Sequence, residues 1–244
     1  MRNIAMTVMY DGTNYCGWQV QPNGVSVASQ IIAAVKRVTG ETVKLYGSGR
    51  TDSGVHALAQ AANFYTESRI AGEQFRRALN AYLPPDVVVT RTWEAEEGFN
   101  ARFSSCGKIY QYLINNGPLQ SPFLLNRAWH VKYPLDLEKM RQAAAVLEGT
   151  HDFNAFMAAG SAVTSTVRTL YSLTCEREGD LITITAKGNG FLYNMVRILA
   201  GTLAYAGGGK LTTSQVRDIL EGKDRTKGAI TAPPHGLYLK EVLY

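Results

Sequence analysis

Residues 42–65 have the sequence TVKLYGSGRTDSGVHALAQAANFY. The two ends of this segment, 42–46 and 56–65, predict β-strands. The octet between them, GSGRTDSG at 47–54, predicts a loop, because its three glycines permit backbone angles and close approaches that other residues resist. Such a loop would present two opposite charges, those of Arg50 and Asp52.

The residues around this segment extend the pattern on both sides. Residues 3–10 alternate and predict a strand, and residues 26–38 have helical apolar spacing that ends near Gly40. Residues 72–82 predict a helix that stops before a Pro-Pro pair, and the β-branched run 86–93 predicts another strand. The resulting order, β-α-β-β-α-β, is the split βαβ arrangement of ferredoxin-like domains.

A second series of elements follows from Lys108 onward in the same order. The predicted strands are 109–115, 166–176, 181–187 and 237–244, and the predicted helices are 135–147, 191–205 and, as an insertion, 214–220. We therefore predict an α/β chain of the α+β type with two ferredoxin-like βαββαβ halves, residues 1–105 and 106–244. Two such halves imply a cleft, which is a common place for a site.

The composition is that of a folded globular protein with a mild positive charge. Of 244 residues, 45% are hydrophobic and 18% are charged, and the formal net charge is +5, which is compatible with a phosphate-bearing partner. Three distant cysteines without CxxC spacing predict reduced thiols, and four scattered histidines predict no metal site. Neither a signal peptide nor a membrane-spanning run is recognisable, so we expect a cytoplasmic protein.

Arg197 is a charge inside the otherwise apolar helix 191–205. The small residues Ala200 and Gly201 share its helical face and would let another element approach closely. Because a guanidinium cannot lose its proton, it needs an acceptor, and Asp52 is one candidate; a carboxylate held by arginine stays ionised, as a nucleophile requires. The alternatives are that Arg197 extends to water and that Asp52 only caps the amides of a turn.

Alternation along the strand 109–115 and the residue before it places Lys108, Tyr110 and Tyr112 on one face. Aromatic rings facing a groove stack on extruded bases, and lysine meets phosphate, although an ordinary amphipathic strand has the same pattern. Lys223 and Arg225 lie in a polar turn that is either a solvated loop or a phosphate contact.

The chain resembles the tRNA pseudouridine synthase A family through motifs that run in the family's order. These are YDGT at 10–13, GWQ at 17–19, GRTD at 49–52, GVHA at 54–57, FNARF at 99–103, KIY at 108–110, GTHDF at 149–153, GNGFLYNMVR at 188–197, LEGKDR at 220–225 and APPHGL at 232–237. Departures from the family pattern are Cys16, Lys108 and Ser53, the last beside Asp52, where alanine is usual.

The resemblance implies the pseudouridine synthase fold, in which a continuous, mainly antiparallel sheet carries a central catalytic cleft. It further implies a homodimer without cofactor or metal that converts uridine to pseudouridine at tRNA positions 38, 39 and 40. The family's catalytic aspartate corresponds to Asp52, its active-site tyrosine to Tyr110, and its paired arginines to Arg50 and Arg197.

Within this resemblance, several roles stay open. Asp52 acts as nucleophile at the ribose or at the base, or as general base at the sugar. Further expected contacts to the RNA are Lys108, Lys223, Arg225, Arg76 and Arg77. The alternatives are a synthase acting on other RNA positions, a non-catalytic RNA-binding module, and a small-molecule hydrolase that uses Asp52.

Overall fold

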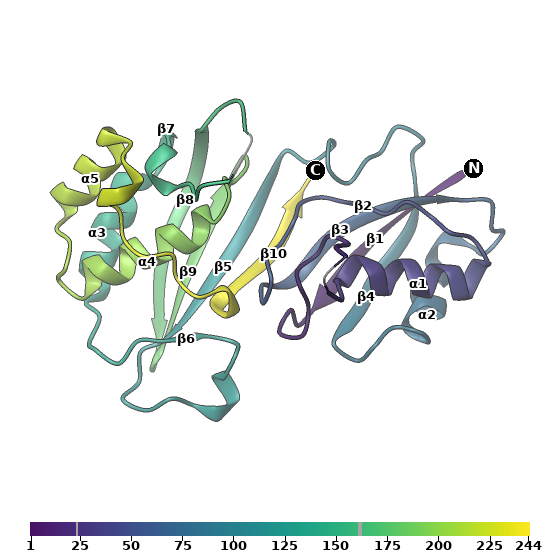
Figure 1. Ribbon diagram of the computed structural model, residues 1–244, viewed down its shortest axis with the longest axis horizontal. Helices are drawn as coiled ribbons and strands as arrows, with labels where there is room; N and C mark the ends of the chain where they lie inside the picture. The colour runs from purple at the N-terminus through teal and green to yellow at the C-terminus, as the bar shows by residue number, and fades with distance from the viewer. Residues whose placement is uncertain (23, 161–162) are drawn as a thin grey trace. The chain divides into compact units, whose positions relative to one another are not determined.

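The computed structural model describes residues 1–22, 24–160 and 163–244. The chain forms two compact units, which are drawn in Figure 1. Unit 1 comprises Met1–Cys106 and Tyr238–Tyr244, and unit 2 comprises Gly107–Leu237. The sequence-based division at 105/106 assigned everything up to residue 244 to the second half. The structure instead groups the last seven residues with unit 1, because their strand pairs there.

Unit 1 is a sheet with helices. Its elements are β1 (Arg2–Tyr10), α1 (Val27–Thr39), β2 (Tyr46–Gly47), β3 (His56–Thr66), η1 (Gly72–Gln74), α2 (Phe75–Asn80), β4 (Val87–Ala95) and β10 (Leu237–Leu243). Strand β1 pairs antiparallel with β3 and β4, and β2 pairs antiparallel with β3. The order β4-β1-β3-β2 is that of the predicted split βαβ arrangement. Strand β10 pairs with β3 in parallel.

Helix α1 begins and ends where its sequence predicts. The Ser26 hydroxyl accepts a hydrogen bond from the Ser29 amide, and the Ser29 hydroxyl accepts one from the Ser26 amide. Two amides at the start of the helix thereby gain hydrogen-bond partners. Gly40 closes the helix in the left-handed conformation. The helices of unit 1 cover a core in which the rings of Phe64 and Phe75 meet edge to face, with centroids 5.6 Å apart.

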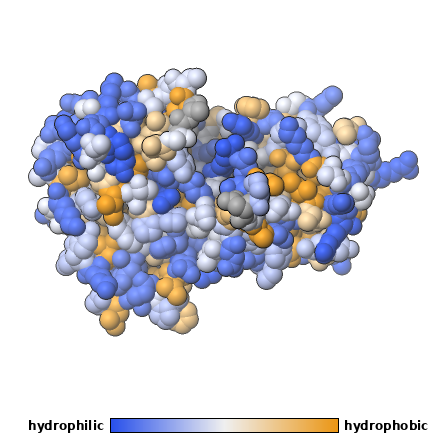
Figure 2. Space-filling view, viewed as in Figure 1, coloured by the Kyte–Doolittle hydropathy of each residue, from blue (hydrophilic) through white to orange (hydrophobic). Residues whose placement is uncertain are grey.

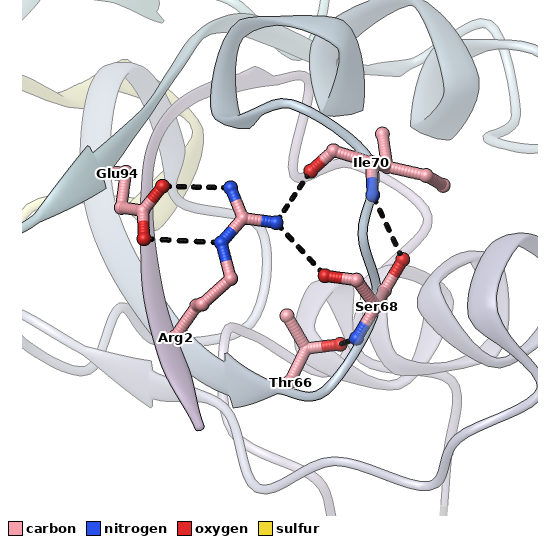
Figure 3. Close-up of polar contacts among 5 residues, drawn as sticks. All are labelled: Arg2, Thr66, Ser68, Ile70 and Glu94. Carbon is pink, nitrogen blue, oxygen red and sulfur yellow. Dashed lines mark hydrogen bonds and ion pairs between the residues drawn. The ribbon is translucent and has the colours of Figure 1, made fainter.

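Figure 3 shows how Arg2 ties the start of β1 to its surroundings. Nε and Nη2 donate to the two carboxylate oxygens of Glu94 at 3.0 and 2.7 Å. Nη1 donates to the carbonyls of Ser68 and Ile70, each at 2.8 Å. The planar guanidinium therefore joins β1, β4 and the turn after β3, a geometry that lysine does not reproduce.

We predict that Arg2→Met lowers the Tm at pH 7 and that the difference from wild type narrows in acid. The hydrogen bond from Arg2 lowers the pKa of Glu94. The Arg2–Glu94 pair therefore stabilises the fold fully above the pKa of an unfolded glutamate, about 4.3. This stabilisation is lost as the pH falls through the lower pKa of Glu94 in the folded protein. Thermal unfolding from pH 7 to pH 2 measures the difference in Tm. The Tm of Glu94→Gln should equal that of wild type at the acid end of this range, where Glu94 is protonated. A constant difference across that range contradicts the account.

Unit 2 repeats the order strand, helix, strand, strand, helix, with additions. Its elements are β5 (Gly107–Asn115), η2 (Pro122–Leu124), β6 (Trp129–His130), α3 (Leu137–Leu147), β7 (Gly149–Asp152), η3 (Asn154–Phe156), β8 (Val167–Glu178), β9 (Leu181–Gly188), α4 (Met195–Gly207), α5 (Thr213–Gly222), η4 (Arg225–Lys227) and η5 (Pro234–Gly236). Its strands run β5-β9-β8-β7, all antiparallel, and β6 pairs with β5 in parallel.

Helix α5 shows how the amphipathic helices of unit 2 are placed. Val216, Ile219 and Leu220 are its buried residues, and Figure 2 shows hydrophilic residues over the outer face of this region. Among the residues described, no helix combines the length and the apolar character needed to cross a membrane.

The expected α+β class with mainly antiparallel pairing is confirmed, while some boundaries differ. The predicted strand 42–46 is wrong except at its end, because β2 begins only at Tyr46. The Glu41 carboxylate accepts hydrogen bonds from the Thr66 hydroxyl and the Glu67 amide. The Glu41 side chain, rather than a strand at 42–45, thus contacts the end of β3. Strands β6 and β7 were not predicted.

Helix α4 begins later than the predicted residue 191. It starts at Met195, because Asn194 has a positive φ of 59° and is not helical. Asparagine tolerates this left-handed conformation better than most residues other than glycine.

Candidate active site

The loop at 47–54 is fixed to β3 by hydrogen bonds near its start. The Ser48 amide donates to the carbonyl of Ala61 at 2.9 Å, and the Ser48 hydroxyl donates to Oε1 of Gln60 at 2.6 Å. Nε2 of Gln60 donates in turn to the carbonyl of Gly49 at 2.9 Å. Because Ser48 and Gln60 are buried, these bonds lie in a low dielectric, where they are stronger than in water.

A second loop, residues 11–18, packs against the first loop at two glycines. A Cβ on Gly17 would overlap the carbonyl oxygen of Thr51, and a Cβ on Gly47 would overlap the Trp18 indole. The Trp18 amide donates to the same Thr51 carbonyl at 3.1 Å. Gly17 also has a φ of 102°, which L side chains rarely adopt. Only glycine at position 17 therefore lets the two backbones meet in this way.

Asp52 lies between two residues whose side chains are bound. The Thr51 hydroxyl pairs with the Tyr10 phenol at 2.7 Å, and the Ser53 hydroxyl donates to the Tyr15 carbonyl at 3.1 Å. Serine at position 53 thus adds a hydrogen bond that alanine could not make. The backbone on either side of Asp52 is anchored, which limits the positions that its carboxylate can reach.

The two charges of the loop differ in exposure. Arg50 is exposed, whereas Asp52 is half-buried. A half-buried carboxylate on an anchored backbone is suited to act as a nucleophile or a general base, because its position is restricted while one side stays accessible.

His56, the first residue of β3, is part of the structure that supports the loop. It is 2% exposed, and its ring stacks on Tyr238 of β10 with centroids 4.7 Å apart. Its Nδ1 lies 3.0 Å from the Gly12 amide and 3.1 Å from Oδ1 of Asp11. A neutral Nδ1 accepts from the amide, whereas a protonated one would pair with Asp11.

In unit 2, Tyr110 lies on β5 opposite Ala186 of β9. Its ring is 8% exposed and meets Phe191 edge to face, with centroids 5.1 Å apart. Lys108 is half-buried and Tyr112 is fully buried. This packing fixes the orientation of the Tyr110 ring.

Arg197 is bound on two sides within unit 2. Its Nε donates to the Ala232 carbonyl at 2.7 Å, and its Nη1 donates to Oδ1 of Asn194 at 2.8 Å. One turn along α4, a Cβ on Gly201 would overlap the Ile230 carbonyl oxygen, so the predicted close approach of another element is confirmed. These contacts to protein atoms favour a placed guanidinium over one that simply extends to water.

Lys223 and Arg225 have partners within unit 2. Nζ of Lys223 lies 2.9 Å from Oδ2 of Asp152, and the Thr166 hydroxyl and Lys223 together lower the pKa of that carboxyl. Nη2 of Arg225 donates to the Thr231 hydroxyl at 3.2 Å. Burial lowers the pKa of the Arg225 guanidinium. Any contact that these two side chains make with a substrate must therefore compete with an internal partner.

The expected site residues are distributed over both units. Arg50 and Asp52 share one loop of unit 1, whereas Lys108, Tyr110, Arg197, Lys223 and Arg225 belong to unit 2. Within 1–22, 24–160 and 163–244, no group of three or more His, Cys, Asp or Glu side chains is arranged to hold a metal ion. The three cysteines are free thiols, and burial raises the pKa of Cys175 to about 12.

A family model described as tRNA pseudouridine synthase matches residues 6–104 and 143–244. The chain belongs to this family of isomerases. The protein named tRNA pseudouridine synthase A from Thermoanaerobacter sp. (strain X514) is 53% identical over 244 residues, covering 100% of both chains. Proteins of the same name are 48% identical over 245 residues in Ruminiclostridium cellulolyticum and 47% identical over 244 residues in Acetivibrio thermocellus, again with 100% coverage of both chains.

The sequence did not reveal which residues support the charged groups. Asn194 and Ala232 bind Arg197, and Tyr10 and Trp18 hold the loop before Asp52. All four fall inside motifs that carry the family resemblance, so their presence was visible although their contacts were not.

We predict that Gly17→Ala destabilises the protein more than Gly40→Ala does. Both glycines have positive φ, so each substitution should cost about 1–2 kcal/mol of backbone strain. Only at Gly17 would the new methyl group also meet the Thr51 carbonyl, whereas nothing lies within 4 Å at Gly40; this overpacking should add about 1–3 kcal/mol. Urea titration of both variants measures the difference. Equal costs would show that the two loops do not depend on this close approach.

Proposed function

We propose that this protein converts uridine to pseudouridine in tRNA with Asp52 as the catalytic carboxylate. The observation that carries the proposal is the anchored loop of unit 1, which holds a half-buried Asp52 between two bound neighbours. The family relationship, which spans the whole chain, supports the reaction class.

The reaction needs the base out of the stack, its N-glycosidic bond broken, and the uracil turned and rejoined to the ribose through carbon. The product is an isomer of the substrate, so atoms and electrons balance without a redox or energy-carrying cofactor. Asp52 attacks the ribose or the base as a nucleophile, or removes a proton from the sugar as a general base. Tyr110 stacks on the extruded base and takes part in proton transfer.

The arginines have separate roles in this proposal. Arg197 keeps Asp52 ionised and oriented, for which a group that is always protonated and bound on two sides is well suited. Arg50, exposed on the loop, contacts the backbone of the flipped nucleotide. Other proposed phosphate contacts are Lys108, Lys223, Arg225, Arg76 and Arg77, the last two exposed on α2.

We further propose that the targets are positions 38, 39 and 40 of the anticodon arm, and that the enzyme is a cytoplasmic homodimer. The support is the resemblance to the tRNA pseudouridine synthase A family. The free thiols are compatible with a reducing compartment.

We predict that Asp52→Ala abolishes pseudouridine formation while tRNA binding is retained. Loss of a group that acts directly on the reacting atoms should lower the rate by on the order of a thousandfold or more. The measurement uses unmodified tRNA with uridines at positions 38 to 40 and maps the product by carbodiimide-dependent primer-extension stops. Asp218→Ala is the matched control, because it removes an exposed carboxylate on α5 of unit 2 and leaves the loop around Asp52 intact.

The outcomes of this mapping separate the possible functions. Stops at positions 38 to 40 with wild type, absent with the variant, support both the reaction and its target. Stops elsewhere in the RNA favour a synthase with another target. RNA binding without conversion by folded wild-type protein would leave a binding module, and the proposal would then be wrong.

We predict that Arg197→Met lowers kcat more than it lowers tRNA affinity and shifts the acid limb of the pH–rate profile upward. Removing the positive charge makes an ionised carboxylate less favourable, so a higher pH is needed to form the active species. Single-turnover rates from pH 5 to pH 8 measure the shift. Arg177→Met is the control, since this arginine of unit 2 is also held by the protein, at Asn116 and Leu135. An unchanged profile in Arg197→Met rejects the role.

A further inference from the structure

The segment 229–236, here called the strap, lies between α4 and β5 within unit 2. On the helix side, the Ala232 amide donates to the Arg197 carbonyl at 3.1 Å. On the strand side, a Cβ on Gly236 would come within 2.6 Å of the Tyr112 ring. The strap thus packs against both elements, and Figure 1 shows it passing α4.

Two consecutive carbonyls of the strap receive hydrogen bonds from the two flanking elements. Nε of Arg197 donates to the Ala232 carbonyl at 2.7 Å, and the Tyr112 hydroxyl donates to the Pro233 carbonyl at 2.8 Å. Pro233 and Pro234 have no N–H, so the strap cannot attach there through backbone donors. Its position at residue 233 depends on a side-chain donor, and the phenol of Tyr112 supplies it.

Tyr112 is well placed to hold this bond permanently. Its side chain is fully buried, and its ring makes a T-shaped contact with Trp129 at a centroid distance of 6.4 Å. Burial raises the pKa of the phenol, and the nearby positive charge of Arg197 acts in the opposite direction. The phenol therefore stays protonated and acts as a donor at neutral pH, close to the guanidinium.

We infer that Tyr112 is a positioning residue for Arg197, acting through the strap. The Tyr112 hydroxyl holds the Pro233 carbonyl, the adjacent Ala232 carbonyl receives Nε, and the guanidinium is thereby aimed in one direction. Without the hydroxyl, the Pro233 carbonyl loses its donor, and the strap that carries the Ala232 carbonyl is held less firmly against β5. The inference rests on the proposed function in one respect, namely that Arg197 serves the reaction.

The variant Tyr112→Phe removes the hydroxyl and keeps the ring. We expect kcat for pseudouridine formation to fall roughly tenfold, as for a small misplacement of a reacting group, with tRNA affinity unchanged. The acid limb of the pH–rate profile should shift upward, in the same direction as in Arg197→Met. In an Arg197→Lys background the same substitution should have much less effect, because the two residues act through one chain of contacts.

Tyr244→Phe is the matched control. Its phenol also donates to a backbone carbonyl, that of Ala101 at 2.9 Å, but the residue is 51% exposed and belongs to unit 1. We expect wild-type kcat and an unchanged pH profile for this variant. If Tyr112→Phe lowers only the Tm, or if its effect on kcat is as large in the Arg197→Lys background, the inference is wrong.

A second measurement does not depend on activity. In NMR spectra of protein with isotope-labelled arginine, the Nε–H signal of Arg197, assigned by its loss in Arg197→Lys, should exchange slowly with water. It should exchange faster in Tyr112→Phe and remain slow in Tyr244→Phe. Equal exchange in all three proteins overturns the inference, whereas absence of pseudouridine with wild type would overturn the proposed function alone.

Discussion

The close contact between the backbones of two loops in unit 1 is the constraint on which the candidate site depends. The Trp18 amide binds the Thr51 carbonyl, and Gly17 leaves room for that oxygen. The residue that follows Thr51 is the proposed catalytic aspartate, so the contact sets the place of Asp52 along the loop. The buried bonds of Ser48 hold the start of the same loop to β3. The carboxylate is thus positioned both by backbone contacts and by the side-chain bonds of its neighbours Thr51 and Ser53.

Unit 2 places its own charged group by a related arrangement. Arg197 lies in the first turn of the buried helix α4, and its guanidinium is directed by a carbonyl of the strap and by the amide oxygen of Asn194. Glycine at 201 lets the strap come close, as glycine at 17 does for the loop of unit 1. In both units a small residue allows a backbone oxygen to reach its donor. Substitutions at such glycines act on chemistry and stability together.

Local patterns predicted most of the fold, because caps and periodicity are encoded in neighbouring residues. The Ser26 cap and the Gly40 stop define α1 as expected. One failure arose where distant residues decide, since the Glu41 side chain binds the end of β3. The other is local, since the positive φ of Asn194 delays the start of α4. In the site, charge and spacing singled out Asp52 and Arg197. Most of their supports could not be predicted, because bonds such as those of Arg197 to Ala232 and of Thr51 to Tyr10 join segments far apart in the chain.

The central claim is that the anchored Asp52 carboxylate isomerises uridine in tRNA. The most direct test is hydrogen release from C5 of uridine, since joining this carbon to the ribose expels its hydrogen. With tRNA tritiated at C5, wild type should release tritium, and the near-isosteric Asp52→Asn should release none while binding the tRNA equally well. Release by Asp52→Asn at the wild-type rate would contradict the account, because the reaction would then not need the carboxylate.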